Sequence, residues 1–495
     1  MTRIVASLVE RSVSGVTCSS REAFRQGAEL VEIRFDHLPA RSLDAGTVSE
    51  VRASVRGPAI ATLRSAVEGG RSKLKGTARE NALKVLLDAG FEYVDLELER
   101  DQRLLKAEGR KGRRPELIAS CHLLRPAEAG KVEKALVRAC AAGDIGKVAM
   151  PCEHAGQAIM LARLGMRRSD AGDRFVLIGM GDQGRLTRVC AGRMGSDMVY
   201  CSLSGKPAAP GQLDVRTQSS LKGKDIVALG LLGHPVSHSV SKPMQEAALR
   251  GARLAGAYLN LDVPPEDMTR ETLETLGEIG FSGLNVTIPH KERVLGMCDG
   301  VDSEAESAGA VNTITFKGSR IYGKNTDMIG FTQALESKKC IVSGTEALVV
   351  GAGGAARAAV LSLRRAGAHV TVSARSPGKA EAMARDMGAD VVSISSLRGT
   401  GPVFDVVVNC TPIGTKGVGG AVPVPSALFR KGVLYFDLVY NPPVTRTMKV
   451  AAARKAAAAG GLEMLVRQGA ASFNSWTGVE PDLRAMRVAA RRALA

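Results

Sequence analysis

The stretch GDIGKVAM, residues 143–150, has the composition of a buried β-strand, yet it carries a lysine, Lys147, at its centre. Burial without a fixed partner disfavours the charged form of an amine, and a neutral amine is what a lysine requires to attack a ketone and form an imine. An edge strand with Lys147 facing water is the ordinary alternative for a lone lysine. Ionisable residues recur at the ends of apolar stretches throughout the first 200 residues, however, so Lys147 is one of a set.

Eight short, apolar, β-rich stretches divide the first 220 residues. They end near Val9, Phe35, Leu63, Leu98, Cys121, Met150, Met180 and Leu203. The segments between them are long enough, and helical enough in composition, to be crossover helices. Eight repeats of strand and helix predict an α/β fold, a closed parallel (β/α)8 TIM barrel with its chemistry at the C-terminal ends of the strands. A doubly wound open sheet is the alternative, and the eightfold count favours the barrel. The ionisable residues at or just beyond the strand ends are Glu32, Arg34, Arg64, Glu68 and His122.

The length of 495 residues predicts roughly three domains, because single domains usually hold about 100–200 residues. Hydrophobic residues make up 45% and charged residues 24%, which excludes a disordered chain. Nine cysteines occur without a CxxC pair, which favours free thiols in a reducing cytoplasm. The N-terminus has no signal-peptide pattern and no apolar run reaches 18 residues, so we expect a soluble, cytoplasmic protein without a membrane partner.

The net charge of +17 raises the question of nucleic acid as a partner. The lysines and arginines are scattered in ones and twos, aromatic residues are only 4%, and no helix-turn-helix or zinc-finger spacing occurs. Small anionic ligands account for the charge equally well, as does a genome that favours arginine. We therefore expect small-molecule substrates and no nucleic acid. Binding that weakens steeply with salt would indicate the contrary.

The polar stretch RTQSSLKGKD, residues 216–225, resembles a linker, and IVALGLLG after it opens a new series of strands and helices. Further along, ALVV leads into GAGGAARAAVLSL, residues 351–363, which predicts a strand, a glycine turn and a helix. Gly351, Gly353 and Ala356 occupy the G-x-G-x-x-A positions of a dinucleotide site. Because the strand HVTVS follows at βαβ distance, the cofactor pyrophosphate is expected at the helix N-terminus, on Gly354 and Ala355.

The end of the HVTVS strand predicts which dinucleotide binds. An NAD site usually places Asp or Glu there for the ribose hydroxyls, whereas this chain reads Ser373, Ala374, Arg375 and Ser376. An arginine at this position suits a 2′-phosphate, so NADP(H) is the expected cofactor. The alternative is that Arg375 merely begins a loop.

The motifs VEIRFD, TLRSAVEGG, SCH, GDIGKVAM, IGMGDQGRLTRV and PAAPGQ, in this order, resemble the type I 3-dehydroquinate dehydratases over nearly the whole of the first 220 residues. The resemblance implies that Lys147 forms a Schiff base with the substrate ketone and that the protonated imine acidifies the neighbouring carbon. His122 would remove that proton and return one to the departing hydroxyl, as suits a group that titrates near neutral pH. Glu68 would orient His122 and favour its charged form.

The same resemblance implies a set of substrate contacts in this half. Arg188 would hold the substrate carboxylate by a two-pronged contact, and the residues that bind hydroxyls or shape the pocket would be Glu32, Arg34, Arg64 and Gln212. Taken singly, each has an ordinary structural alternative, such as an ion pair of Arg34 with Asp36. Two positions depart from the family pattern: Thr187 precedes Arg188 where Ser is common, and Ala208 stands where a lid serine is common.

The motifs GHPVSHSVSKP, GLNVTIPHK, AGAVNT, GKNTD, NCTPIG, DLVYNPPVT and MLVRQGAASFNSWTG, in this order, resemble shikimate dehydrogenase over residues 225–485. The resemblance implies that Ser239 and Ser241 bind the substrate carboxylate and that Lys291 and Asp327 form the catalytic pair. The ring hydroxyls would be contacted by Thr287, Asn312 and Gln468. Reduction of a ketone leaves an alkoxide, which a lysine beside a carboxylate can protonate without a metal.

Structural alternatives remain for several of these residues. Asp327 after Thr326 is a plausible helix N-cap, and Lys291 a solvated helix start, although the positive end of a helix disfavours a lysine. Tyr440 is either a wall of the substrate and nicotinamide cleft or core packing. The family pattern is also broken where Lys242 replaces a common proline, Gln245 and Glu246 replace His-Asn, and Ala374 replaces an Asn.

Together the halves resemble the bifunctional fusions of dehydroquinate dehydratase with shikimate dehydrogenase, in which 3-dehydroshikimate made by the first activity is the substrate of the second. The expected domains are residues 1–221 (barrel), 222–330 (substrate-binding lobe), 331–470 (Rossmann lobe) and 471–495 (a C-terminal helix returning to the substrate lobe). A quinate-sensing regulator with dead sites and a quinate-oxidising enzyme using NAD are the alternatives. Retention of Lys147, His122, Lys291 and Asp327 argues against the regulator, and Arg375 argues against the use of NAD. The sequence does not indicate which oligomeric state the protein adopts.

Overall fold

The computed structural model describes residues 2–108, 115–203, 205–222, 226–237, 239–397, 403–418 and 422–494. The chain divides into two compact units, one of residues 1–226 with 261–280 and the other of residues 227–260 with 281–495. In the ranges described, no helix has the length and apolar character needed to cross a bilayer.

The first unit is built on eight parallel strands that pair in chain order, with the last beside the first. The strands are β1 (Arg3–Leu8), β2 (Leu30–Arg34), β3 (Ala59–Thr62), β4 (Tyr93–Glu97), β5 (Glu116–His122), β6 (Ile145–Pro151), β7 (Phe175–Met180) and β8 (Met198–Cys201). The N–H of Asp197, just before β8, donates to the carbonyl of Phe175 in β7 (2.7 Å), which links the two strands at the remaining side of the ring. A doubly wound sheet would reverse its strand order, and this sheet does not. The predicted TIM barrel is confirmed.

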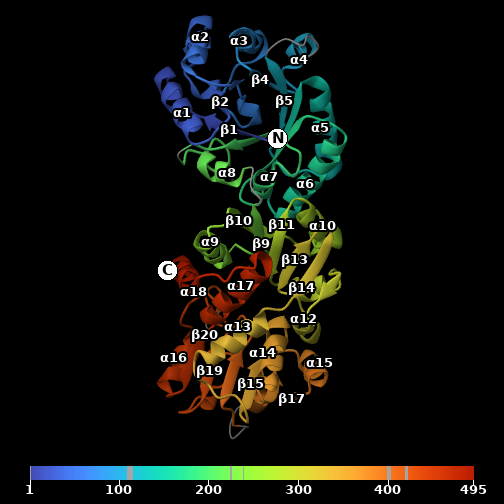
Figure 1. Ribbon diagram of the computed structural model, residues 1–495, viewed down its shortest axis with the longest axis vertical. Helices are drawn as coiled ribbons and strands as arrows, with labels where there is room; N and C mark the ends of the chain where they lie inside the picture. The colour runs from blue at the N-terminus through green and yellow to red at the C-terminus, as the bar shows by residue number, and fades with distance from the viewer. Residues whose placement is uncertain are drawn as a thin grey trace. The chain divides into compact units, whose positions relative to one another are not determined.

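Helices follow the strands of the first unit and surround them (Figure 1). They are α1 (Val13–Arg25), α2 (Ala45–Ser54), α3 (Gly76–Asp88), α4 (Gln102–Glu108), α5 (Ala129–Ala142), α6 (Ala155–Asp170), α7 (Leu186–Val189) and α8 (Val215–Leu221). Helix α10 (Arg270–Glu278), later in the chain, also belongs to this unit and packs against α6. Several of these helices have a capping side chain at the N-terminus. Ser12, Asp44 and Asp214 each accept a hydrogen bond from the backbone N–H three residues ahead. Such N-caps typically stabilise a helix by about 1 kcal/mol.

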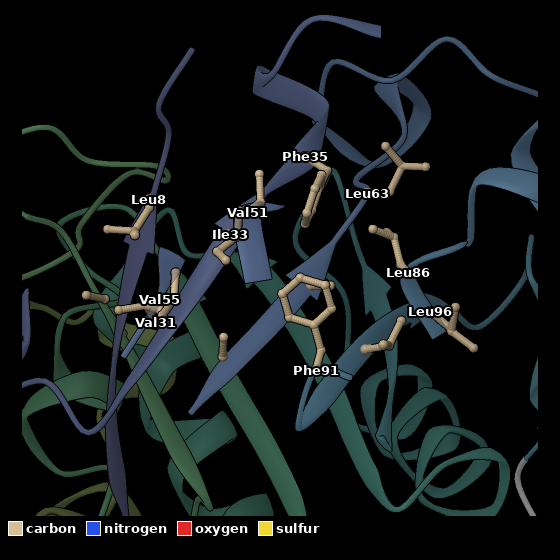
Figure 2. Close-up of a cluster of buried hydrophobic side chains, with 14 of the residues drawn as sticks. Leu8, Val31, Ile33, Phe35, Val51, Val55, Leu63, Leu86, Phe91 and Leu96 are labelled. Atoms are coloured by element: carbon tan, nitrogen blue, oxygen red, sulfur yellow. The ribbon is translucent and has the colours of Figure 1, made fainter. Parts of the chain in front are cut away.

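The outward faces of the barrel strands pack against the helices in one apolar cluster. Figure 2 shows its side chains, among them Val31 and Ile33 of β2 and Val51 of α2. The rings of Phe35 and Phe91 meet edge to face, with centroids 5.9 Å apart and planes at 86°. Because side chains alternate between the two faces of a strand, Glu32, between Val31 and Ile33, faces the barrel interior.

The same alternation directs Lys147 in β6. Ile145 and Ala149 belong to the apolar cluster inside the barrel, so Lys147, which lies midway between them, points to the interior as well. Gly146 faces the opposite way, against α5, where a Cβ would lie only 2.5 Å from the Cys140 sulfur. Close packing on one face of β6 and the apolar interior on the other therefore hold the amine inside the barrel.

The second unit contains two six-stranded sheets. The first is mixed, in the order β10-β9-β11-β13-β14-β12, and consists of β9 (Val227–Gly233), β10 (Gly256–Asp262), β11 (Phe281–Val286), β12 (Gly300–Val301), β13 (Thr313–Lys317) and β14 (Arg320–Lys324). The second is parallel, in the order β17-β16-β15-β18-β19-β20, and consists of β15 (Glu346–Val350), β16 (His369–Ser373), β17 (Asp390–Val391), β18 (Val406–Asn409), β19 (Leu434–Asp437) and β20 (Ala457–Gly460). This second order is that of a dinucleotide-binding Rossmann sheet. The predicted two-lobed α/β architecture is confirmed.

The helices of the second unit are α9 (Ser241–Gly251), α11 (Lys291–Leu295), α12 (Ser303–Ala308), α13 (Asp327–Glu336), α14 (Gly354–Arg365), α15 (Pro377–Met387), α16 (Arg446–Ala453), α17 (Leu462–Thr477) and α18 (Leu483–Leu494). Helix α18 packs against α9, and Phe473 and Met486 share an apolar cluster with Leu229 and Met244 of the first sheet and its helix. The C-terminal segment thus completes the core beside β9. Helix α17 begins at Leu462, so the domain boundary expected at residue 470 falls inside a helix.

Candidate active sites

Lys147 lies in the barrel interior with an exposed fraction of only 3%. Its Nζ is 3.0 Å from Oδ2 of Asp95 in β4 and 3.9 Å from Oε1 of Glu32 in β2. The same nitrogen lies 3.9 Å from the centroid of the Tyr200 ring. Two carboxylates and a ring face therefore surround one amine in a site that excludes most water.

Arg64, just beyond β3, joins Lys147 to the rest of the interior through Asp95. Its Nη2 donates to Asp95 Oδ1 (2.8 Å), and its Nη1 donates to Ser120 Oγ (2.9 Å) and to Glu97 Oε1 (3.4 Å). Burial alone would raise the pKa of Asp95, but the charges of Arg64 and Lys147 outweigh it and hold that pKa well below its usual range. Asp95 is therefore an anion shared by two cations.

His122, at the end of β5, faces Glu68 from the loop after β3. Nδ1 of His122 is 3.0 Å from Glu68 Oε2, and the His122 backbone N–H donates to the same oxygen (3.2 Å). Burial, together with the positive charges of Arg64 and Lys147, lowers the pKa of His122 well below its ordinary value. Burial also raises the pKa of Glu68 to about 7, against the opposing charge of Arg64. Burial therefore favours the neutral imidazole, the form that a general base requires, over the charged form that Glu68 was expected to favour.

Arg188, in α7, is a buried guanidinium whose hydrogen bonds go to backbone carbonyls. Nη1 donates to Gly179 O (2.6 Å) and Nη2 to Pro210 O (3.4 Å), and Nε has no partner among the described residues. Burial lowers its pKa to about 10, so the group remains charged at neutral pH. A buried cation that faces carbonyls rather than a carboxylate suits an anionic ligand.

The remaining predicted residues of the barrel have defined partners. Glu32 accepts from Ser7 Oγ (2.7 Å) and Thr62 Oγ1 (3.0 Å), and Arg34 forms a two-pronged pair with Asp36 at 2.8 Å in both contacts. Gln212 accepts from the Ala208 N–H (2.8 Å) and donates to Ser7 Oγ (3.4 Å), which ties the loop after β8 to β1. Arg34 therefore has the ion pair that the sequence offered as its structural alternative.

Several site residues escaped the sequence analysis, above all the acids of β4. Asp95 bridges Lys147 and Arg64, and Glu97 accepts from the Ser65 N–H (2.7 Å). Behind them Arg79 of α3 pairs with Asp101 through two contacts of 2.8 Å. The available signal was the pattern YVDLELE, in which acids alternate with apolar residues in a strand that is otherwise buried.

The second site is centred on Lys291 and Asp327, whose Nζ and Oδ2 lie 2.5 Å apart. Lys291 is the first residue of α11 and Asp327 the first of α13. The other Asp327 oxygen accepts from Asn312 Nδ2 (2.7 Å), so the carboxylate bonds side chains and does not cap its own helix, whose N-cap residue is Thr326. The Asp327 side chain is 8% exposed and that of Lys291 18%, which leaves the amine within reach of a ligand.

The predicted carboxylate contacts are adjacent. Ser239 donates to Ser241 Oγ (3.0 Å), and Tyr440, whose pKa is raised by burial, lies beside Ser239. Gln468 of α17 directs Oε1 toward Asn312 Nδ2 (3.5 Å). Thr287, which directly follows β11, is half-buried. Tyr258, which lies beside Ser241 and donates to Asn285 Oδ1 (2.9 Å), was missed because its strand reads as ordinary core.

The glycine turn between β15 and α14 has the geometry that a dinucleotide requires. Gly351 has φ +127°, and a Cβ at Gly353 would meet nothing within 4 Å, so the backbone is open to close approach. Helix α14 begins at Gly354 with no side chain capping its N-terminus, and Ala355 and Ala356 follow in its first turn. A Cβ at Gly354 would lie 3.8 Å from Cδ of Lys291, which places this turn beside the Lys291–Asp327 pair.

At the end of β16, Ser373 has a buried hydroxyl without a partner in the described part of the chain, and Arg375 and Ser376 are exposed. An uncommitted hydroxyl and a free arginine fit a nucleotide phosphate at this point. In the described ranges, no group of three or more His, Cys, Asp and Glu side chains is placed to hold a metal ion.

Comparison with known proteins assigns a family to each half of the chain. The family model "Type I 3-dehydroquinase" matches residues 4–221. The bifunctional 3-dehydroquinate dehydratase/shikimate dehydrogenase, chloroplastic, of Arabidopsis thaliana is 29% identical over 96% of this chain and 82% of its own length.

The second half matches three models, described as the shikimate dehydrogenase substrate binding domain (residues 231–314), shikimate / quinate 5-dehydrogenase (334–445) and the shikimate 5'-dehydrogenase C-terminal domain (461–491). The shikimate dehydrogenase (NADP(+)) of Dehalococcoides mccartyi strain 195 is 39% identical over 54% of this chain and 95% of its own. The crystal structure of shikimate 5-dehydrogenase from Thermus thermophilus, in complex with NADP(H) and shikimate, superposes with a TM-score of 0.51 at 40% identity, over 54% of this chain and 100% of that one. The chain therefore belongs to the shikimate dehydrogenase family and carries a type I 3-dehydroquinase domain ahead of its dehydrogenase half.

Proposed function

We propose that the protein converts 3-dehydroquinate to 3-dehydroshikimate through a Schiff base on Lys147, and then reduces 3-dehydroshikimate to shikimate with NADPH at the Lys291–Asp327 pair. The observation that carries the proposal is the burial of one amine inside the barrel, 3.0 Å from a carboxylate and surrounded by the residues that dehydration requires. We also place the protein in the cytoplasm, because all nine cysteines are free thiols.

In the dehydratase site, Lys147 reacts as the free amine: its ammonium proton passes to the neutral imidazole of His122, the amine adds to the ketone carbon, and the imidazolium protonates the hydroxyl, which leaves as water. The protonated imine that results withdraws electrons from the adjacent carbon. His122, held neutral, takes the proton from that carbon through Nε2 while Nδ1 donates to Glu68. The imidazolium then returns a proton to the departing hydroxyl, which leaves as water. Hydrolysis of the imine releases the product and restores the amine.

Substrate binding in the barrel rests on Arg188, with Arg34, Arg64, Glu32 and Gln212 around it. The substrate carboxylate supplies the anion that the buried Arg188 lacks, and a guanidinium binds it in a fixed orientation. Gln212 already fastens the loop of Ala208 to Ser7 of β1, so this loop has an anchor although Ala208 has no hydroxyl.

In the dehydrogenase site, Ser239 and Ser241 hold the substrate carboxylate, and Thr287, Asn312, Gln468 and Tyr440 contact the ring. NADPH, when bound, supplies the hydride. Lys291 donates a proton to the oxygen of the reduced ketone. Asp327, at 2.5 Å, stabilises the charged ammonium and passes a new proton to Lys291 afterwards. Gly351, Gly353, Gly354, Ala355 and Ala356 would hold the pyrophosphate, and Ser373, Arg375 and Ser376 the adenosine 2′-phosphate.

Replacement of Arg375 by alanine tests the cofactor assignment. A charged hydrogen bond to a phosphate contributes about 1.5–3 kcal/mol, so the KM for NADPH is expected to rise about tenfold to a hundredfold, while that for NADH stays constant. Steady-state kinetics with both cofactors measures the change. Arg385→Ala, an exposed arginine in the last turn of α15, is the matched control. Equal losses with NADH and NADPH would contradict a role in 2′-phosphate recognition.

The pH dependence of dehydration tests the Glu68–His122 pair. Glu68 must be ionised to accept the Nδ1 proton of His122, and its pKa of about 7 means that this form is lost as the pH falls through that value. The dehydratase kcat is expected to fall about tenfold per pH unit below this point. In Glu68→Gln the same limb is expected to flatten, with a rate about tenfold to a hundredfold lower because His122 is less well oriented. Glu99→Gln, on the exposed side of the unit, should keep the wild-type profile, and an unchanged limb in Glu68→Gln would assign the titration to another group.

Two assays on the purified full-length protein test the function as a whole. Dehydration of 3-dehydroquinate is followed by absorbance of the conjugated product, and shikimate oxidation by formation of NADPH. Activity with quinate and NAD that exceeds activity with shikimate and NADP would replace the biosynthetic proposal with a catabolic one. Absence of both activities would contradict the proposed function.

A further inference from the structure

A continuous network of buried hydrogen bonds lies in the core of the second unit, next to the dehydrogenase site. It starts at Tyr258 of β10, whose hydroxyl lies beside the side chain of Ser241. Tyr258 donates to Asn285 Oδ1 (2.9 Å), and Asn285 Nδ2 donates to Ser472 Oγ on α17 (2.9 Å). One end of the network therefore lies beside Ser241, which the proposed function assigns to the substrate carboxylate.

Ser472 is the point at which the network branches. Its Oγ lies 2.8 Å from Thr313 Oγ1 and 3.1 Å from Thr326 Oγ1, and it also donates to the carbonyl of Gln468 (2.9 Å). Both threonine hydroxyls reach Asn312 Oδ1, at 2.9 and 3.1 Å. A serine hydroxyl has one proton and two lone pairs, so the hydrogen bonds around Ser472 are interdependent.

The other end of the network is the catalytic pair. The backbone N–H of Thr326 donates to Asn312 Oδ1 (2.8 Å), which turns the amide so that Nδ2 faces Asp327 Oδ1 at 2.7 Å. Asp327 binds Lys291 through its second oxygen. The orientation of the Asn312 amide therefore decides whether Asp327 Oδ1 accepts a hydrogen bond while Oδ2 binds Lys291.

Burial of so many polar side chains lowers the stability of the fold unless all of them are hydrogen-bonded. Tyr258, Thr313 and Ser472 are fully buried, and Asn285, Asn312 and Thr326 are at most 5% exposed. Buried polar groups lose hydration, and only a fully bonded network compensates for that loss. Apolar side chains of similar shape would fill the same space at lower cost, so attachment of α17 to the sheet does not by itself explain the hydroxyls.

We propose that Ser472 is a positioning residue for the dehydrogenase reaction. Its hydroxyl sets the direction of the hydrogen bonds on both sides, so that Asn312 donates to Asp327 while Tyr258 and Asn285 hold Ser241 toward the substrate carboxylate. The carboxylate contact and the proton donor are thereby held at a fixed separation that matches one substrate. This inference rests on the proposed dehydrogenase function.

Ser472→Ala tests the inference in the full-length protein. We expect kcat for shikimate oxidation to fall about tenfold and KM for shikimate to rise severalfold, because a small misplacement of catalytic groups is enough for such losses. The KM for NADP should not change. The pH profile of shikimate oxidation should also change, because Thr313 and Thr326, whose hydroxyls bond Asn312 Oδ1, each lose Ser472 as a hydrogen-bond partner. Ser472→Thr retains the hydroxyl and is expected to restore most of the activity.

Matched variants separate this role from a loss of folding. Ser475→Ala, on the same helix, removes a hydroxyl that bonds only to the helix carbonyl of Ala471 (3.0 Å), and it should leave both KM and the pH profile unchanged. Dehydratase activity of the same preparations reports the amount of protein, and an unchanged KM for NADP together with the circular dichroism spectrum reports the fold of the second unit. If Ser472→Ala fails to fold, Tyr258→Phe keeps the ring and removes the hydroxyl that bonds Asn285 beside Ser241. That variant should raise KM for shikimate severalfold without shifting the pH profile.

The outcomes distinguish the inference from the function on which it rests. A wild-type protein without NADP-dependent shikimate oxidation overturns the proposed function. An active wild-type protein whose Ser472→Ala or Tyr258→Phe variants keep the wild-type KM for shikimate overturns only the positioning role. A lower melting temperature with unchanged KM and pH profile would likewise reduce Ser472 to a structural residue.

Discussion

Lys147→Met is expected to abolish dehydration of 3-dehydroquinate while shikimate oxidation continues at the wild-type rate. Loss of a covalent nucleophile typically costs about 10⁴-fold or more in kcat. The variant should fold, because methionine fills a similar volume and Asp95 retains its 2.8 Å contact with Arg64 after the amine is gone. Steady-state kinetics of both reactions on one preparation measures the separation of the two activities.

Borohydride reduction in the presence of 3-dehydroquinate identifies the amine directly. In the wild type, peptide mapping should find the substrate-derived mass on Lys147, and in Lys147→Met it should find none. Lys134→Met, on the exposed face of α5, is the matched control and should be labelled and active like the wild type. Label on a different lysine, or full dehydratase activity in Lys147→Met, would refute the assignment of the barrel site.

Lys291→Met is expected to have the reciprocal effect, with shikimate oxidation lowered about 10²–10⁴-fold and dehydration unaffected. Asp327→Asn should lose a similar factor, since an amide accepts no proton and its nitrogen would face the Lys291 ammonium at the present 2.5 Å contact. The two single losses should not add in the double variant, because the residues act as one unit.

Initial rates with shikimate and NADP, and with 3-dehydroquinate, measure this second effect. Lys449→Met, on an exposed face of α16, should keep both activities. A Lys291→Met protein that oxidises shikimate within tenfold of the wild type would show that proton transfer is carried by another group.

The architecture could be predicted because the barrel and the Rossmann sheet depend on local patterns. Each barrel strand ends within two residues of the position expected from its apolar stretch, and the glycine turn at Gly351 lies between β15 and α14 as predicted. The residues that act were also visible in part, since Lys147 and His122 are polar where a strand should be apolar. The sequence therefore indicates at which strand positions a polar side chain stands where an apolar one is expected.

The partners of those residues could not be predicted, because they depend on contacts between distant segments. Glu68 meets His122 across 54 residues, and Asp95 meets Lys147 across 52. Ser472, which is ordinary in a helix that otherwise reads as core, reaches Asn285 across 187 residues. No local pattern marks such a serine, since its role arises only when three strands and a helix come together.

The packing of Gly146 against α5 also limits how this part of the gene can change. Removing one codon from β6 would exchange the two faces of the strand on one side of the deletion. Lys147 could then be turned toward Cys140, where even a methyl group has no room, and the barrel would lose its nucleophile and its packing together. Point substitutions are thus the tolerated form of variation in this strand, whereas length changes should accumulate only in the connections at its ends.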